Sequence, residues 1–132
     1  MKLKYFLLIL FLVSYFELSA KVLIKKDIPY RENSTTVRNL LDVYYPENTE
    51  EAKDVLVFIH GGSWNSGKKE IYWWLGKNMA RKNVVSVIIN YSLSPESQYE
   101  KMALHCAMAI KWVRDSIARC GGREDRILVM GH

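Results

Sequence analysis

The sequence predicts an α/β protein built on a largely parallel sheet. Three short runs of consecutive apolar, often β-branched residues lie at 55–59, 84–89 and 127–130, and the stretches between them have helical periodicity. Strands buried on both faces of a parallel sheet have such continuous runs, and alternation of strands with helices is typical of α/β folds. Apolar residues make up 49% of the 132 residues and charged residues 25%, which excludes a disordered or fibrous chain and suits one folded domain.

The first twenty residues have the pattern of a secretory signal peptide. Lys2 and Lys4 precede an uncharged run at 5–16, and Ala20 supplies a small residue at the expected cleavage site. The run is shorter than the roughly 20 apolar residues that cross a bilayer, so an uncleaved anchor is the weaker interpretation. We therefore expect a secreted, periplasmic or extracellular protein, with residues 21–132 as its mature part and no stable membrane anchor after cleavage.

Charge and cysteine usage exclude several classes of partner. The net charge is +5, but the basic residues are scattered among acidic ones, so we expect a solvated surface and no nucleic-acid binding. Cys106 and Cys120 fall in one helical pattern, which separates them by roughly 21 Å, far beyond disulfide reach. They are interpreted as unpaired core residues. Because no C-x-x-C motif and no nearby histidine at ligand spacing accompany them, no metal or redox role is predicted for these cysteines.

The predicted elements follow one another in a simple order. Residues 22–28 and 40–45 are β-prone and separated by a polar stretch, which indicates an antiparallel hairpin or meander. The run at 55–59 is the first strand expected to be buried on both faces. Residues 69–82 are predicted to form an amphipathic helix that covers the sheet with Ile71, Trp74, Leu75 and Met79.

The second half of the chain continues the alternation. After the strand at 84–89, a long helix is predicted from apolar residues at alternating spacings of three and four: Ala103, Cys106, Ile110, Val113, Ile117 and Cys120. Gly121-Gly122 is expected to end this helix in a left-handed turn, before a third buried strand at 127–130. His105 lies one position off the apolar stripe, so a partly exposed structural role is expected for it.

Two loops carry the residues that point to chemistry. His60-Gly61-Gly62-Ser63-Trp64 follows a buried strand, and its glycines allow a sharp turn that leaves backbone N–H groups free to hold a developing negative oxygen. The alternative is a plain glycine-rich turn. Gly131-His132 follows the last strand and matches the first two positions of G-x-S-x-G, the elbow that exposes a serine nucleophile.

A third segment lies between these loops, Asn90-Tyr91-Ser92-Leu93-Ser94-Pro95-Glu96. In order and spacing, the three segments resemble the N-terminal half of the α/β-hydrolase esterase and lipase family. The hormone-sensitive-lipase-like and feruloyl/acetyl-xylan-esterase-like branches are the most similar. The resemblance covers 41–132. It implies the N-terminal half of an α/β-hydrolase fold, and a serine-dependent carboxylic ester hydrolase that acts on a small-molecule ester without a cofactor.

The same resemblance assigns roles to particular residues. It implies that the N–H groups of Gly62 and Ser63 form part of an oxyanion hole, with His60, Gly61 and Trp64 supporting the loop.

The resemblance also implies that Gly131 and His132 lead into the elbow, so the nucleophilic serine is expected directly after His132 and the other triad residues later still. No catalytic residue then lies in these 132 residues, and we expect the chain alone to be inactive. We also expect poor stability, because the last strand would have an open edge.

Two departures from the family pattern stand out. Ser63 replaces a third glycine, which a backbone donor should tolerate. Ser92 replaces the usual arginine, which puts any ion pair of that arginine in doubt.

Three alternatives stay open. The stretch from Gly62 to Lys69 is one residue from the phosphate-binding pattern G-x-x-x-x-G-K-[ST], but Lys69 has no hydroxyl to hold Mg²⁺. Ser63 could itself be a nucleophile, although bulky Trp64 follows it. Finally, the protein could be a non-catalytic or decayed relative that binds partners through the same fold.

Overall fold

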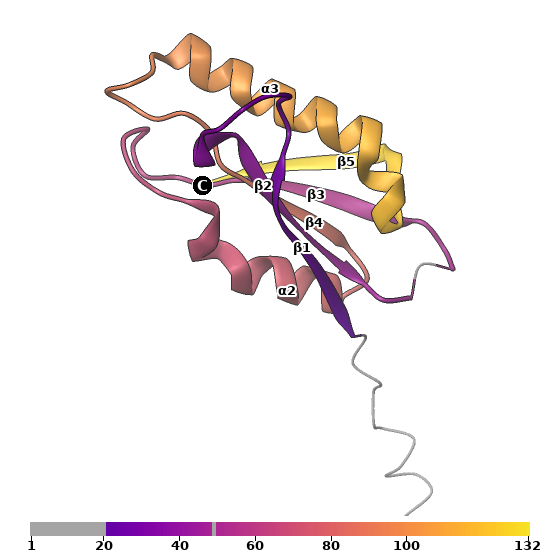
Figure 1. The fold of residues 1–132 in the computed structure, drawn as a ribbon. Coiled ribbons are helices and arrows are strands. Elements are labelled where there is room, and N and C mark those ends of the chain that lie inside the picture. Colours follow the sequence, from indigo (N-terminus) through magenta and orange to yellow (C-terminus); the bar gives the residue numbers. More distant parts are fainter. Residues whose placement is uncertain (1–20, 49) are drawn as a thin grey trace, which may run out of the picture.

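The computed structural model describes residues 21–48 and 50–132, so the signal peptide predicted for 1–20 lies outside the described residues. Figure 1 shows a sheet between two helices, with strand order β1-β2-β4-β3-β5. The strands are β1 (Val22–Pro29), β2 (Leu40–Pro46), β3 (Lys53–Ile59), β4 (Val85–Ile89) and β5 (Gly122–Gly131). The helices are η1 (Val37–Asn39), η2 (Lys69–Tyr72), α2 (Trp73–Arg81), α3 (Tyr99–Ser116) and η3 (Ile117–Cys120).

The strand pairing confirms an α/β fold with a mixed sheet. The predicted hairpin forms, because β1 pairs antiparallel with β2, and β2 continues antiparallel onto β4. β3 is the middle strand of the parallel part of the sheet. In the strand register, Val57 of β3 is paired with Val87 of β4 on one side and with Val129 of β5 on the other. Each parallel connection contains a helix, as a parallel crossover requires.

Two hydrophobic clusters lie on opposite faces of the sheet. Successive side chains of a strand point to opposite faces. Val57 and Val87 accordingly belong to the cluster that α3 covers, whereas Phe58 and Ile88 belong to the cluster that α2 covers. This is why the strands at 55–59 and 84–89 are apolar at consecutive positions, as the sequence predicts.

The first helix differs from its prediction in start and in face. Residues 69–72 form a 3₁₀ turn, and the α-helix begins only at Trp73. Leu75 is partly buried as expected, but Ile71 and Trp74 are exposed, and the fully buried positions are Gly76 and Ala80. Small residues allow the helix to lie close to the sheet. A Cβ on Gly76 would lie 2.4 Å from the ring of Tyr44.

The long helix is also rotated relative to its predicted stripe. Val113, Ile117 and Cys120 are buried as expected, but in the first half the buried positions are Met102, His105 and Ala109, and Ala103 is exposed. The expectation that His105 is partly exposed is therefore wrong. The polar partners of His105 lie beneath the helix, so a polar residue occupies a position that apolar periodicity skips.

The last strand forms at the predicted place but is not buried. β5 is the edge of the sheet next to β3, and Leu128, Val129 and Met130 are 67%, 45% and 37% exposed. Only one neighbouring strand pairs with it among the described residues, which accounts for the exposure. Gly121 adopts a left-handed φ of 73° and ends the preceding turn as predicted.

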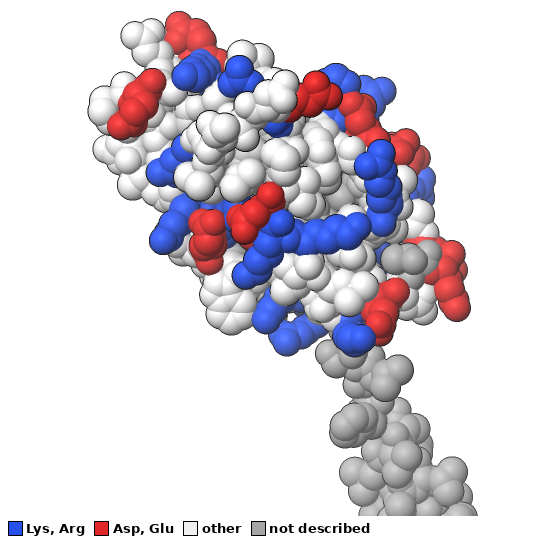
Figure 2. Space-filling view, in the orientation of Figure 1, with Lys and Arg blue, Asp and Glu red and all other residues white. Residues whose placement is uncertain are grey.

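The described surface carries mixed charge. On the face drawn in Figure 2, the basic side chains are interspersed with acidic ones. In the described part of the chain, no helix is long and apolar enough to cross a membrane.

Candidate active site

The loop that follows β3 lies at the carboxyl ends of the parallel strands, where α/β proteins commonly bind ligands. The end of the described chain reaches the same place, as the marked C-terminus in Figure 1 shows. The His132 N–H donates to the carbonyl of Ile59 over 3.2 Å. A Cβ on Gly61 would lie only 2.6 Å from the His132 carbonyl oxygen. Gly61 thus allows the end of β5 to lie directly against the loop.

A tight turn shapes the loop itself. The carbonyl of Gly62 accepts hydrogen bonds from the Asn65 N–H (3.2 Å), the Ser66 N–H (3.1 Å) and the Ser66 hydroxyl (2.8 Å). Gly62 has a φ of +125°, and Ser63 and Trp64 have φ values of 52° and 60°. Left-handed conformations are unusual for residues other than glycine, so the loop is held in a strained form.

The turn leaves two amides open. Among the described residues, neither the Gly62 N–H nor the Ser63 N–H donates a hydrogen bond. A cavity of about 290 Å³ lies here, lined by Gly61, Gly62, Ser63, Trp64, Tyr91 and His132. Successive free amides in such a turn form a concavity that binds negatively charged oxygen. The loop thus has two unbonded amides beside a cavity at the carboxyl ends of the parallel strands.

His60 is a buried support of the loop. Its Nδ1 lies 2.9 Å from the carbonyl oxygen of Gly61, and its ring stacks on Tyr91 at 4.7 Å between centroids. Burial lowers the pKa of His60, so the ring is neutral near pH 7. A Cβ on Gly67 would lie 2.5 Å from His60 Nδ1, so glycine is required there. This placement fits an orienting role and leaves the ring away from the cavity lining.

The segment after β4 donates hydrogen bonds to the backbone of the loop after β3. The sequence did not predict this supporting role. The Tyr91 hydroxyl donates to the His60 carbonyl over 2.9 Å, and the Ser94 N–H donates to the Trp64 carbonyl over 2.8 Å. Asn90 lies one residue earlier, and its Oδ1 accepts from the Lys69 N–H over 2.7 Å. The available signal was a run of polar residues directly after a fully buried strand.

Lys69 is buried in a cluster of carboxylates. Its side chain is 1% exposed, and Nζ lies 2.7 Å from Asp27, 2.8 Å from Asp42 and 3.0 Å from Glu70. Burial opposes the charge, but the hydrogen bonds to the three carboxylates outweigh it and raise the pKa of Lys69. The ammonium group therefore anchors the start of η2 to the hairpin.

The same observations weaken the nucleotide-binding alternative. In a phosphate-binding loop, consecutive amides cradle the phosphates. Here the amides of Asn65 and Ser66 are directed to the Gly62 carbonyl, and Lys69 is enclosed by carboxylates.

Among the described residues, no group of three or more His, Cys, Asp or Glu side chains could hold a metal ion.

Ser63 lacks the partner that a nucleophile needs. A serine nucleophile is activated by a base within hydrogen-bond reach. His60 Nδ1 contacts Gly61, and His132 Nδ1 lies 3.2 Å from the Tyr72 hydroxyl. His105 Nδ1 hydrogen-bonds to the side chains of Asn39 and Ser92. No imidazole in the described part of the chain hydrogen-bonds to the Ser63 hydroxyl.

Ser92, which stands in place of the family's arginine, contacts His105 instead of a charged partner. The Ser92 hydroxyl and the Asn39 side-chain amide both lie within hydrogen-bond distance of His105 Nδ1, the amide nitrogen at 3.0 Å.

Both cysteines are free, as predicted. Burial raises the pKa of Cys106 to about 11, which leaves its thiol protonated near pH 7.

The sheet order, the two covering helices and the glycine turn after β3 define an α/β-hydrolase fold of the esterase branch. The chain belongs to the BD-FAE family, whose model matches residues 41–132. The resemblance inferred from the sequence is thereby confirmed.

Individual relatives agree with this assignment. The chain is 34% identical over 94 residues to the probable isoprenylcysteine alpha-carbonyl methylesterase ICMEL1 of Arabidopsis thaliana, a match that covers 71% of this chain and 20% of that protein. It is 33% identical over 108 residues to the esterase LipQ of Mycobacterium tuberculosis, covering 80% of this chain and 25% of LipQ. The chain thus spans about a quarter or less of these two proteins.

Solved structures show the same fold. Esterase B from Lactobacillus rhamnosis superposes with a TM-score of 0.78 at 19% identity, over 90% of this chain and 38% of the esterase. A structure from an analysis of two fungal esterases of Rhizomucor miehei has a TM-score of 0.69 at 28% identity, over 85% of this chain and 35% of that chain.

Proposed function

We propose that the whole protein is a serine-dependent carboxylic ester hydrolase in which the amides of Gly62 and Ser63 form part of the oxyanion hole. The observation that carries the proposal is the pair of unbonded amides on the cavity beside the end of β5. Membership of a family with esterase relatives supports the reaction class.

The position of the end of β5 supports the rest of the arrangement. The His132 carbonyl group lies against Gly61, so a residue attached to it begins beside the loop. A serine at that position would attack the acyl carbon of an ester, and a histidine further along the chain would accept its proton. The negative charge would develop on the carbonyl oxygen, where the two amides can hold it. Preorganised donors of this kind stabilise a transition state by about 3–4 kcal/mol each.

Substrate and location belong to the same proposal. The relatives named above are esterases, which supports a small-molecule ester as substrate. The pattern of residues 1–20 supports export, and its test is the mass of the protein recovered outside the cell. We expect that protein to begin at Lys21. Recovery with residues 1–20 intact would contradict cleavage at this site.

The experiment for the reaction uses the whole protein and short-chain p-nitrophenyl esters. Replacing the residue that follows His132 by alanine should lower kcat by about 10⁶-fold, the cost of removing a serine nucleophile in a known protease. Ser63→Ala should lower it by less than about tenfold, because Ser63 acts through its backbone. The 132-residue chain should show no turnover.

Other outcomes have clear meanings. Loss of activity in Ser63→Ala, with full activity in the variant at the position after His132, would transfer the nucleophile to Ser63. Absence of ester hydrolysis by a correctly folded whole protein would favour the non-catalytic alternative.

A further inference from the structure

A second cavity lies apart from the oxyanion loop. It has a volume of about 390 Å³ and forms where the β1–η1 connection, the segment after β4 and the start of α3 meet. It shares no lining residue with the cavity in front of the loop. Its volume falls within the range of cavities that bind small organic molecules.

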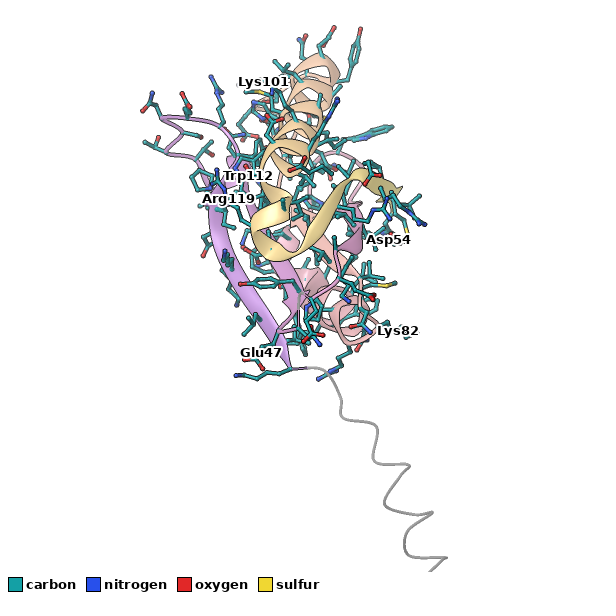
Figure 3. All side chains as sticks on the ribbon, turned by 90° about the vertical axis from the view of Figure 1, so that its right-hand side faces the viewer. Glu47, Asp54, Lys82, Lys101, Trp112 and Arg119 are labelled. Atoms are coloured by element: carbon teal, nitrogen blue, oxygen red, sulfur yellow. The ribbon has the colours of Figure 1, made fainter. Side chains whose placement is uncertain are left out.

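Three basic residues line this cavity and have no acidic partner among the described residues. Arg31, Arg38 and Lys101 line it, and none of them forms an ion pair with any described residue. Arg38 donates from Nη1 to the Gly67 carbonyl over 2.9 Å, which leaves its charge uncompensated. Glu96 is the one carboxylate among the lining residues. Figure 3 shows Lys101 near the start of α3.

A buried histidine lines the same cavity. His105 is 3% exposed, and the Asn39 side-chain amide donates to its Nδ1 over 3.0 Å. Because Nδ1 accepts, the proton of the neutral ring lies on Nε2. This Nε2–H makes no hydrogen bond to the described residues. Burial lowers the pKa of His105, and the charges of Arg31 and Lys101 lower it further, so the ring is neutral near pH 7.

We propose that this cavity binds a small organic anion through a phosphate or carboxylate group. Guanidinium groups match both anions with paired hydrogen bonds, and a lysine ammonium adds a compact positive charge. Ser92 and His105 line the cavity as buried, uncharged polar groups. Among the described residues that line the cavity, Glu96 is the one carboxylate that a bound anion would meet. The site is independent of the ester-hydrolase proposal, because it uses none of the oxyanion-loop residues.

Titration calorimetry of the whole protein at low ionic strength tests the proposal. The probes are inorganic phosphate, glycerol 3-phosphate and succinate, with uncharged glycerol as the control ligand. At least one anion should bind saturably with a Kd near or below about 1 mM, and added salt should weaken it. The imidazole NMR signals of His105 should shift on binding. The anion that binds most tightly identifies the group that the cavity recognises.

Matched variants locate the binding site. Arg31→Gln and Lys101→Gln should each weaken binding by about tenfold or more, since each removes a charge-assisted hydrogen bond. Both side chains are exposed, so the fold should persist, and circular dichroism checks this. Lys111→Gln is the control, because Lys111 is an exposed lysine on the same helix that does not line the cavity and is paired with Asp115. Failure of all three anions to bind saturably, or equal weakening by Lys111→Gln, would overturn the proposal.

Discussion

Replacing Lys69 by methionine should strongly destabilise the protein, even though this lysine is absent from the cavity in front of the loop. Methionine keeps the length of the side chain but removes its charge. The ammonium group is buried between β1, β2 and η2, and it contacts the carboxylates of Asp27, Asp42 and Glu70 within 3.0 Å.

The expected loss follows mainly from one of these partners. The Asp42 carboxylate is 2% exposed, so without Lys69 it becomes a buried charge with no cation. Breaking such a pair on one side costs about 3–5 kcal/mol. Asp27 and Glu70 are 63% and 51% exposed, so water screens their charges and they add little. The ratio of folded to unfolded chain should therefore fall by roughly 10²-fold to several 10³-fold.

The assay compares two neighbouring lysines. Urea unfolding followed by far-UV circular dichroism should show a much lower midpoint in Lys69→Met and an unchanged midpoint in Lys68→Met, because Lys68 is exposed. Resistance to a protease at 25 °C should fall in Lys69→Met only. Combining Lys69→Met with Asp42→Leu should restore part of the stability, since no buried charge then remains. The restoration is partial because the Asp27 N–H loses its acceptor on Asp42. Equal protease resistance of the two single variants would refute the reasoning.

The remaining predictions concern the helix, the buried histidine and the loop. Gly76→Ala should lower the free energy of unfolding by about 1–3 kcal/mol, because the new Cβ would lie 2.4 Å from the Tyr44 ring. This loss should exceed the gain from the higher helix propensity of alanine. A urea titration that shows stabilisation would contradict this expectation. Burial lowers the pKa of His105 in the folded state, so stability should fall as pH drops below its unfolded value near 6.5, and His105→Gln should flatten that dependence between pH 7 and 5. In the whole protein, Gly62→Ala should lower kcat for p-nitrophenyl esters by about 10²–10³-fold. The alanine Cβ would lie 2.4 Å from the Ser66 carbonyl oxygen and displace the open amides. An unchanged kcat would argue against the oxyanion role.

The sequence predicted the fold class and the strands well because burial on both faces of a sheet leaves an unambiguous pattern. It predicted the helix faces less well. The apolar pattern places Trp74 inward, whereas the helix packs through Gly76 and Ala80. Close packing selects small residues, which hydrophobic periodicity does not count. In the same way, His105 was placed outside because its buried polar partners come from distant parts of the chain.

The candidate site was predicted only as far as local sequence determines it. The glycines at 61 and 62 indicated a turn with open amides, and the described loop has that form. The supports from Tyr91 and Asn90 depend on which strand lies beside β3, and a single sequence does not contain that pairing. The acidic cluster around Lys69 was missed for the same reason, since two of its three carboxylates come from 27 and 42 residues away along the chain.

Strain and open donors in the loop have a common cause. Holding Ser63 and Trp64 in left-handed conformations costs on the order of 1–3 kcal/mol per residue. The hydrogen bond from the Ser94 N–H to the Trp64 carbonyl, and the turn closed on the Gly62 carbonyl, offset that cost. The same turn directs the amides of Gly62 and Ser63 away from every described acceptor. In the proposed oxyanion hole, this strained form of the loop would keep both amides available to the substrate oxygen.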